Sequence, residues 1–146
     1  MAKQAYVFDA QLDHLRGVRR TVAVRADQSL ADLHRALQEA FGWSDDHLYA
    51  FWLSGEFLAH DGSEYAPLVD GFKPGRFTRA IKSAETALAD LELEIRQPIA
   101  YLFDFGDQWR VRLVLRELAA DDGRPYPRVV EGVGEAPRRR HHARAA

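Results

Sequence analysis

The chain of 146 residues contains no cysteine. This absence excludes structural disulfides, thiolate metal sites and a cysteine nucleophile. Long apolar runs are also absent: none approaches the ~20 residues that a membrane-spanning helix needs, and the first residues lack the apolar segment of a secretory signal. We therefore predict a cytoplasmic protein without membrane contact.

Charge of neither sign dominates, because the formal net charge is −2. Residues 1–123 carry 14 Lys and Arg against 20 Asp and Glu, whereas residues 124–146 carry 6 Arg against 2 Glu. An acidic body with a basic end is not typical of a domain built wholly around a phosphate backbone. We predict one folded domain over residues 1–133 and a basic, disordered tail over 134–146.

The strongest secondary-structure signal lies in residues 29–41. Apolar side chains recur there at helical spacing, at Leu30, Leu33, Leu37 and Phe41. Ser29 and Asp32 suit a capping box, and Gly42 suits the left-handed residue that ends a helix. We predict an amphipathic helix whose apolar stripe is covered by a sheet.

Alternating apolar residues predict the strands of that sheet. Residues 6–12 and 18–25 alternate on either side of Arg16 and Gly17, which indicates a hairpin that turns there. The elements expected next are strands over 47–53 and 56–59, a loop over 60–82 that could contain a short extended piece near residues 65–69, and a short helix over about 84–91.

A second hairpin is predicted over residues 99–117. Gly106 lies between its two strands, where we expect it to supply a positive φ. From Asp121 onward, proline and glycine are expected to end regular structure. This order of elements predicts a single α+β domain with a mixed, mostly antiparallel sheet.

Three blocks of residues carry a family resemblance. They are Leu30, Leu33, His34, Gln38, Phe41, Gly42, Trp43, His47, Leu48 and Phe51; then Tyr101, Asp104, Phe105, Gly106, Asp107 and Trp109; and finally Tyr126, Pro127, Gly132, Gly134, Glu135, Ala136 and Pro137. Together they resemble the plasmid pRiA4b ORF-3-like family. The resemblance implies a domain of uncharacterised function associated with mobile elements, often labelled a TnpR-like passenger of an insertion element.

The chain departs from the family pattern at three places. Arg19, Arg20 and Thr21 stand where the family commonly has Trp-Arg-Arg, so only Arg20 matches. The family's histidine after the hairpin tryptophan is replaced by Val111 or Arg112. Arginines replace the family's acidic, cysteine-containing ending, so the resemblance implies no activity that depends on that ending.

The family-motif residues supply the candidate site, which comprises His34, Gln38, Trp43, His47, Asp104, Asp107 and Trp109. The histidines, with His60, could form an open zinc site, but their spacing matches no known ligand pattern. Two carboxylates are too few to argue a hard-cation site, and a hairpin turn explains both. We predict no metal and no cofactor. If His34, His47 and the Asp104–Asp107 turn converge, a metal-dependent or acid–base enzyme is the alternative.

Arginine and aromatic side chains are in surplus. Arg19, Arg20, Arg110 and Arg112 would form a basic strip for nucleic acid if their strands are neighbours. The aromatic residues could form an exposed platform, although core packing is favoured; they are Trp43, Tyr49, Phe51, Trp52, Tyr101, Phe103 and Trp109. The leading hypothesis is a non-catalytic binding or accessory module that contacts a protein or nucleic acid.

Overall fold

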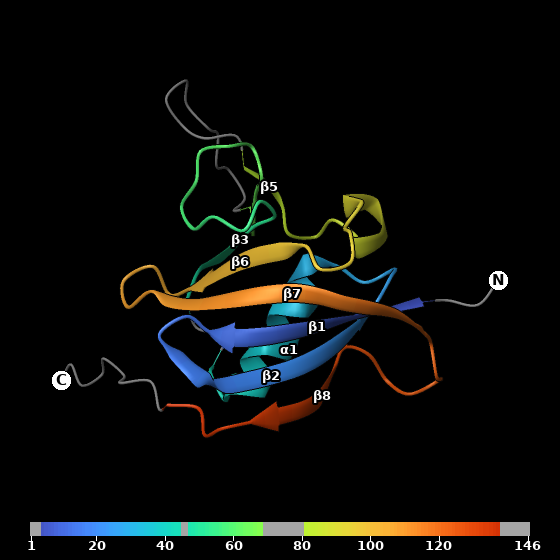
Figure 1. Cartoon of the computed structure of the whole chain (residues 1–146). Coiled ribbons are helices and arrows are strands. Elements are labelled where there is room, and N and C mark those ends of the chain that lie inside the picture. Colours follow the sequence, from blue (N-terminus) through green and yellow to red (C-terminus); the bar gives the residue numbers. More distant parts are fainter. Residues whose placement is uncertain (1–3, 45–46, 69–80, 138–146) are drawn as a thin grey trace.

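The computed structural model describes residues 4–44, 47–68 and 81–137. Within them, one sheet has the strand order β5-β4-β3-β6-β7-β1-β2-β8, with helix α1 against one face (Figure 1). The elements are β1 Gln4–Leu12, β2 Leu15–Arg25, α1 Leu30–Phe41, β3 Tyr49–Trp52, β4 Glu64–Ala66, β5 Lys82–Ser83, the 3₁₀ helix η1 Leu88–Leu91, β6 Pro98–Phe103, β7 Trp109–Ala120 and β8 Arg128–Val133. All neighbouring strands are antiparallel except β4 and β5. The predicted α+β class and mostly antiparallel sheet are confirmed.

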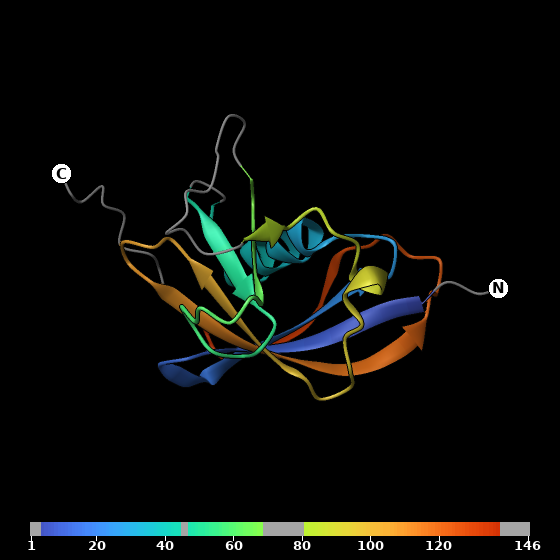
Figure 2. The ribbon, with the colours of Figure 1, turned by 90° about the horizontal axis from the view of Figure 1, so that it is seen from above.

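Helix α1 forms as its sequence predicts. The Ser29 side chain accepts a hydrogen bond from the Asp32 N–H, and the Asp32 carboxylate accepts one from the Ser29 N–H, which completes a capping box. Gly42 ends the helix with a left-handed φ of 74°. The apolar stripe is fully buried, because the sheet bends around the helix (Figure 2). No helix in the described ranges is both long and apolar enough to cross a bilayer.

The main core lies between α1 and the sheet. Its fully buried members include Phe8, Leu12, Val22, Leu33, Leu37, Phe51, Tyr101, Phe103 and Leu113. They come from α1 and from strands that are far apart in sequence, so burial of one apolar stripe joins both halves of the chain.

A second, smaller core lies on the opposite face of β3 and β6. Ala50, Trp52, Ala100 and Leu102 form it, and the segment after β3 covers it with Phe57, Ala59 and Ala66. The indole N–H of Trp52 donates to the Ala59 carbonyl at 3.2 Å. Both faces of β3 and β6 are therefore covered. Of the seven aromatic residues weighed from the sequence, six are buried and Trp109 is half-buried, so they form no exposed platform.

The turn between β1 and β2 lies at Asp13 and His14, so the turn predicted at Arg16 and Gly17 is wrong. The alternation in β2 becomes clear only at Val18, because the residues before it are exposed on both faces. A strand whose first residues are all in contact with solvent shows no period of two. The pattern therefore places the start of β2 three residues late.

The strand predicted over 56–59 is also wrong. Gly55 and Leu58 have positive φ angles of 86° and 62°, which turn the chain there. The strand that pairs with β3 is instead β4, which overlaps the short extended piece considered near residues 65–69 of the predicted loop. Residues 69–80 of that loop lie outside the described ranges.

Regular structure between β5 and β6 is shorter than the helix predicted over about 84–91. Only η1 is helical, and its single turn contains one fully buried residue, Leu88. The preceding backbone instead docks against α1, where the N–H groups of Leu30 and Ala31 donate to the carbonyls of Thr86 and Ala84 at 3.3 and 2.8 Å. These carbonyls satisfy N–H groups at the start of α1 that have no intrahelical partner.

Strand β8 follows Asp121, where the sequence pattern predicts an end to regular structure. Its side chains are half-buried or exposed, so it lacks the apolar alternation that marks other strands. Pairing with β2 defines it instead. The chain continues to Ala136, which packs against the main core, and residues 138–146 lie outside the described ranges. The boundary between domain and tail at residue 133 stays a prediction.

Candidate functional site

Helix α1 and strand β6 bring His34, Gln38 and Tyr101 together in the main core. The Tyr101 hydroxyl lies 2.7 Å from Nδ1 of His34 and 2.9 Å from Nε2 of Gln38. His34 and Gln38 are one helical turn apart, so both side chains reach the same strand residue. All three are buried, with His34 only 1% exposed. His34 and Gln38 are therefore two polar residues on the apolar, buried face of α1.

The Tyr101 hydroxyl is shared between the two helix side chains. Gln38 donates through Nε2 to the Tyr101 oxygen. The roles of His34 and Tyr101 as donor or acceptor in their mutual hydrogen bond depend on the imidazole tautomer. The His34 ring stacks on Tyr49 with a centroid separation of 3.6 Å. Oε1 of Gln38 is buried and has no hydrogen-bond partner among the described residues.

Asp104 organises the turn between β6 and β7. It takes a positive φ of 67°, and its Oδ1 accepts the N–H groups of Gly106 and Asp107 at 3.1 and 3.3 Å. Gln108 also has a positive φ, whereas Gly106 does not, so the expectation that Gly106 supplies it is wrong. Aspartate tolerates this conformation because its short side chain bonds to the backbone that follows.

His47 lies beside this turn. Its Nδ1 is 3.7 Å from Oδ2 of Asp104, which is an ion-pair distance if the imidazole is protonated but exceeds a hydrogen bond. His34 and His47 both pack against Phe103, with ring centroids 6.1 Å from it in each case. The two histidines therefore lie on the same aromatic cluster.

Trp43 and Trp109 complete that cluster. Trp43 stacks on Phe41 and Phe103, and its ring centroid is 5.4 Å from that of Trp109. The indole N–H groups of both tryptophans are buried and have no hydrogen-bond partner within the described part of the chain. Apart from Asp107, which is exposed on the turn, the candidate residues from the sequence thus gather around Tyr101 and Phe103.

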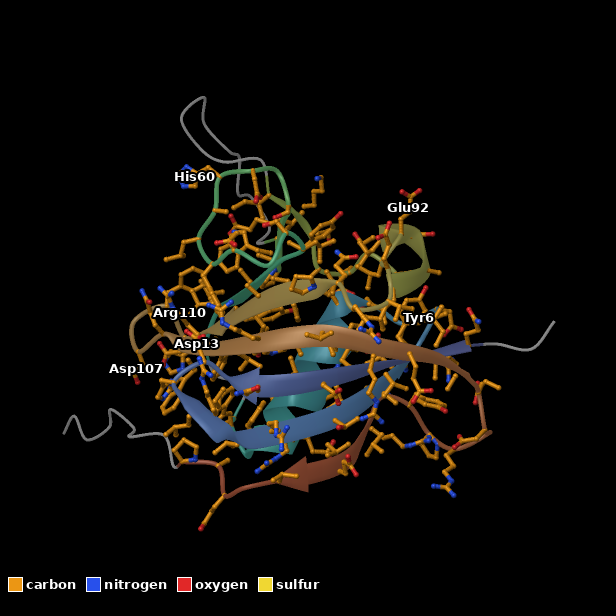
Figure 3. All side chains as sticks on the ribbon, in the orientation of Figure 1. Tyr6, Asp13, His60, Glu92, Asp107 and Arg110 are labelled. Carbon is orange, nitrogen blue, oxygen red and sulfur yellow. The ribbon has the colours of Figure 1, made fainter. Side chains whose placement is uncertain are left out.

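The histidines do not form the zinc site considered from the sequence. His60 is exposed on the loop after β3 (Figure 3), whereas His34 is buried in the main core. Among the residues that the structure describes, no three His, Cys, Asp or Glu side chains are placed to hold a metal ion. His34, Gln38 and Tyr101 instead form a hydrogen-bonded group of polar side chains inside the main core.

Arg20 and Arg19 are consecutive residues of β2 and point to opposite faces. Arg20 points toward α1, where its Nε donates to the Ala40 carbonyl at 2.8 Å and its guanidinium lies over the Phe41 ring. It also donates to the Val133 carbonyl of β8 at 3.0 Å. Arg20 therefore places a cation at the C-terminal end of α1 and ties it to the sheet.

Arg19 points away from α1, onto the face of the sheet that we call the open face, formed by β7, β1, β2 and β8. Strands β2 and β7 are separated by β1, so the condition for the basic strip, that the arginine strands are neighbours, is not met. Gln11 of β1 pairs with both Arg19 and Arg112, which places the three residues in one row.

A hollow of about 600 Å³ lies on the open face. Its lining includes Asp9, Gln11, Arg19, Thr21, Arg112, Arg116 and Glu131. Asp9 accepts from Thr21 at 3.0 Å and from Arg116 at 3.1 Å. Arg19 and Glu131, by contrast, make no ion pair with any described residue. Within the hollow, Asp9 and Arg116 thus neutralise each other, whereas Arg19 and Glu131 carry charges of opposite sign that are unpaired among the described residues.

Two arginines of β7, Arg112 and Arg110, are held in place by neighbouring side chains. Arg112 pairs with Asp13 at 2.5 Å, and Arg110 donates to Gln108 at 2.8 Å. Both guanidinium groups lie over the ring of Phe57, at 5.1 and 4.9 Å. Sequence reasoning missed the acidic members of the open face. The alternation of β1, which places Asp9 and Gln11 opposite its apolar side chains, was the signal that could have found them.

Comparison with known proteins agrees with the motif cluster. A sequence profile of the plasmid pRiA4b ORF-3-like proteins matches residues 4–139. The chain belongs to the plasmid pRiA4b ORF-3-like family. An uncharacterised protein of Sinorhizobium fredii, y4hQ, is 28% identical over 127 residues, which are 86% of this chain and 60% of that protein. The chain therefore spans less than two thirds of the length of this relative.

A solved structure shares the fold of this family member. It is the crystal structure of a protein of unknown function from Methanosarcina mazei Go1, with a TM-score of 0.73 and 21% sequence identity. The similarity covers 94% of this chain and 73% of the other. At this identity it shows the fold alone.

Several residues of the pRiA4b ORF-3-like pattern have packing roles here. A Cβ atom on Gly132 would lie 2.9 Å from the Arg20 side chain, and one on Gly134 would lie 2.2 Å from the Gly17 carbonyl oxygen. Gly134 also has a φ of 81°. These glycines let β8 and the residues after it approach β2, so this block of the pattern is explained by the fold.

Proposed function

We propose that this protein is a non-catalytic binding module that contacts a partner protein through the open face. The observation that carries the proposal is the hollow on that face, where Arg19 and Glu131 keep their charges unpaired among the described residues. A segment with side chains of both signs can pair with the two open charges, while Val114 and Val133 offer apolar contact beside them.

A protein partner fits this face better than a nucleic acid does. Phosphate recognition needs positive charges that the protein leaves unneutralised. Here Arg20 is committed to α1, and Arg112 and Arg116 are each paired with an aspartate. Arg110 is held by Gln108 and the ring of Phe57. Glu131 adds a negative charge inside the hollow itself. The face is therefore of mixed charge and does not form a continuous basic strip.

The enzyme alternative has one observation in its favour, which is that His34, Gln38 and Tyr101 meet and His47 lies near Asp104. A catalytic group must reach the reacting atoms of a substrate. The first three side chains are almost fully buried, and Nδ1 of His34 is already engaged with the Tyr101 hydroxyl. We therefore assign this cluster to the core. The link to insertion elements and the cytoplasmic location stay predictions.

The proposal is tested with a displayed library of random peptides selected on the wild-type protein. Enriched peptides should carry acidic and basic side chains, and should lose at least about tenfold in affinity for Arg19→Glu and for Glu131→Arg. Glu85→Arg is the matched control, because it makes the same charge change at an exposed residue that follows β5, at the opposite edge of the sheet. Failure to enrich any peptide whose binding depends on Arg19 or Glu131 would contradict the proposal.

Nucleic-acid binding is measured in parallel. Fluorescence anisotropy with short single- and double-stranded DNA and RNA is recorded over a salt series for the wild type and Arg19→Glu. We expect weak binding that does not distinguish the two proteins. Tight, salt-sensitive binding that is lost in Arg19→Glu would replace the protein partner by a nucleic acid.

A further inference from the structure

Strand β8 forms one edge of the sheet. It pairs with β2 on one side, and no described strand lies on its other side (Figure 1). Val130 and Val133 are 47% and 51% exposed. Edge strands present unpaired N–H and C=O groups that can accept another strand, and proteins usually block them with a covering segment, lysine, proline or a β-bulge. Lysine and proline are both absent from β8, and its one irregularity in register lies next to Val129.

The sequence of β8 is complementary to itself when two copies run antiparallel. Residues 128–131 read Arg-Val-Val-Glu. A two-fold axis between Val129 and Val130 sets Arg128 opposite Glu131 of the second copy, and the valines opposite each other. A symmetric dimer makes each such contact twice. Both ends of the four-residue segment therefore form an opposite-charge pair.

The backbone register allows these pairs to form on one face. Arg128 pairs with Ala23 and Glu131 with Thr21, and these two residues of β2 lie on the same face because they are two apart. Arg128 and Glu131 are three apart, and the irregular register in β8 next to Val129 compensates for the odd spacing. Both charged side chains therefore point to the open face. A two-fold axis perpendicular to the sheet places the open faces of the two copies on the same side, so these charged side chains can meet there.

Arg128 is already held in position. Its guanidinium donates to Asp122 at 2.8 and 3.2 Å and lies 4.4 Å from the centroid of the Tyr126 ring. The hydrogen bonds to Asp122 use the terminal nitrogens, so Nε is left to donate to a second carboxylate. A side chain that is already ordered loses less conformational entropy when it binds.

We propose that two copies of this chain associate through antiparallel pairing of their β8 strands, with Arg128 of each copy opposite Glu131 of the other. The two sheets then form one continuous sheet, and the two hollows of the open face lie on the same side of it. This inference does not rest on the partner-protein function proposed above, and in the dimer Glu131 is paired, so Arg19 is then the open charge of each hollow.

Sedimentation velocity over a concentration series of the purified full chain tests the proposal. The wild type should pass from monomer to dimer as concentration rises. Glu131→Arg and Arg128→Glu each place like charges opposite each other, and each should raise the dimer dissociation constant at least about tenfold. Glu85→Arg, at the opposite edge of the sheet from β8, should leave the dissociation constant unchanged. A wild type that stays monomeric throughout would overturn the proposal.

Mixing the two single variants gives the decisive measurement. The Glu131→Arg copy carries arginine at both positions of the pair, and the Arg128→Glu copy carries glutamate at both. Opposite charges therefore face each other again in a mixed dimer, and association should be restored near the wild-type strength. The restored dimer also shows that both variants are folded. A wild-type dimer that neither substitution weakens, or variants that fail to associate when mixed, would rule out pairing in this register.

Discussion

The hydroxyl of Tyr101 joins two buried polar side chains that come from one face of α1. Without it, Nδ1 of His34 and Nε2 of Gln38 would both lie in the main core without their present partner. A buried polar group that loses its hydrogen bond costs more than the bond itself contributes when it is present. At this residue the fold is therefore sensitive to the loss of a single atom.

Tyr101→Phe removes that atom and preserves the shape of the ring. We expect the free energy of unfolding to fall by about 1–3 kcal/mol, because two buried groups lose a partner. Urea denaturation followed by tryptophan fluorescence measures the change. Tyr65→Phe is the control, since Tyr65 is half-buried and makes no hydrogen bond through its hydroxyl among the described residues. Equal stability of wild type and Tyr101→Phe would show that the network is not needed.

Gly134→Ala tests the close approach of the chain to β2. The added Cβ would overlap the Gly17 carbonyl oxygen, and the left-handed φ of 81° disfavours any side chain. We expect a loss of at least about 1 kcal/mol in the free energy of unfolding. Gly17→Ala is the control, because its Cβ would meet no atom within 4 Å. Similar melting curves for the two variants would contradict the role assigned to Gly134.

At the scale of elements, the capping box of α1 makes stability depend on pH. Burial acts to raise the pKa of Asp32, but hydrogen bonds from the Ser29 N–H and from Arg35 outweigh it and lower that pKa. A carboxyl whose pKa is lower in the folded state stabilises the fold fully above its unfolded pKa. That contribution is lost as pH falls through the folded value.

Asp32→Asn should therefore be less stable than the wild type at pH 7 by about 0.3–1 kcal/mol, because the charge at the N-terminus of α1 is lost. The difference should begin to shrink as pH falls below about 4, the ordinary pKa of aspartate, and should go on shrinking as pH falls through the lower folded value. Denaturation at pH 7 and pH 3 gives both values. A difference that is the same at both pH values would show that the charge contributes nothing.

The elements differ in how far local sequence predicts them. The sequence predicts helix α1 with both ends, because its capping residues and its stripe lie within one continuous segment. It indicates β4 only as a short extended piece within a loop and does not predict β8, because pairing with β3 and β2 defines these strands and their own side chains show little alternation. The turn after β6 lies where it is predicted, but its left-handed residue is Asp104, which a preference for glycine does not reveal.

At the scale of the whole molecule, the sheet joins the two ends of the chain. Strand β1 pairs along its whole length with β7, so residues near 4–12 meet residues near 111–120. Such pairs must form by closing a loop of about a hundred residues, which is slow because many chain conformations are lost before contacts are gained. The topology, more than any one contact, sets the folding rate.

We therefore expect the main refolding phase to take milliseconds to seconds at about 25 °C, as for other proteins rich in distant strand pairs. Stopped-flow fluorescence detects it, since Trp43 and Trp52 are buried in the native state. The rate should be extrapolated to zero denaturant. Complete refolding within tens of microseconds would indicate that distant pairing does not limit the reaction.

The candidate site shows the same division between local and distant information. Its sequence motifs single out His34, Gln38, Asp104 and the tryptophans, and the fold gathers them. Whether the buried histidine meets solvent or Tyr101 depends on a strand residue 67 positions away along the chain. The open face could not be assembled from the sequence, because Arg19 and Arg112 are in one row only through β1.

What the sequence determined by itself was local: the helix and its caps, the alternating strands, the α+β class and the family. Hydrogen bonds between near neighbours and the periodicity of side chains are properties of a short segment, so they can be read from it. The tertiary structure alone decided that Arg20 supports α1 while Arg19 faces outward, that β8 forms an edge, and that opposite charges share one hollow. These depend on strand order and register, which burial of the whole core selects.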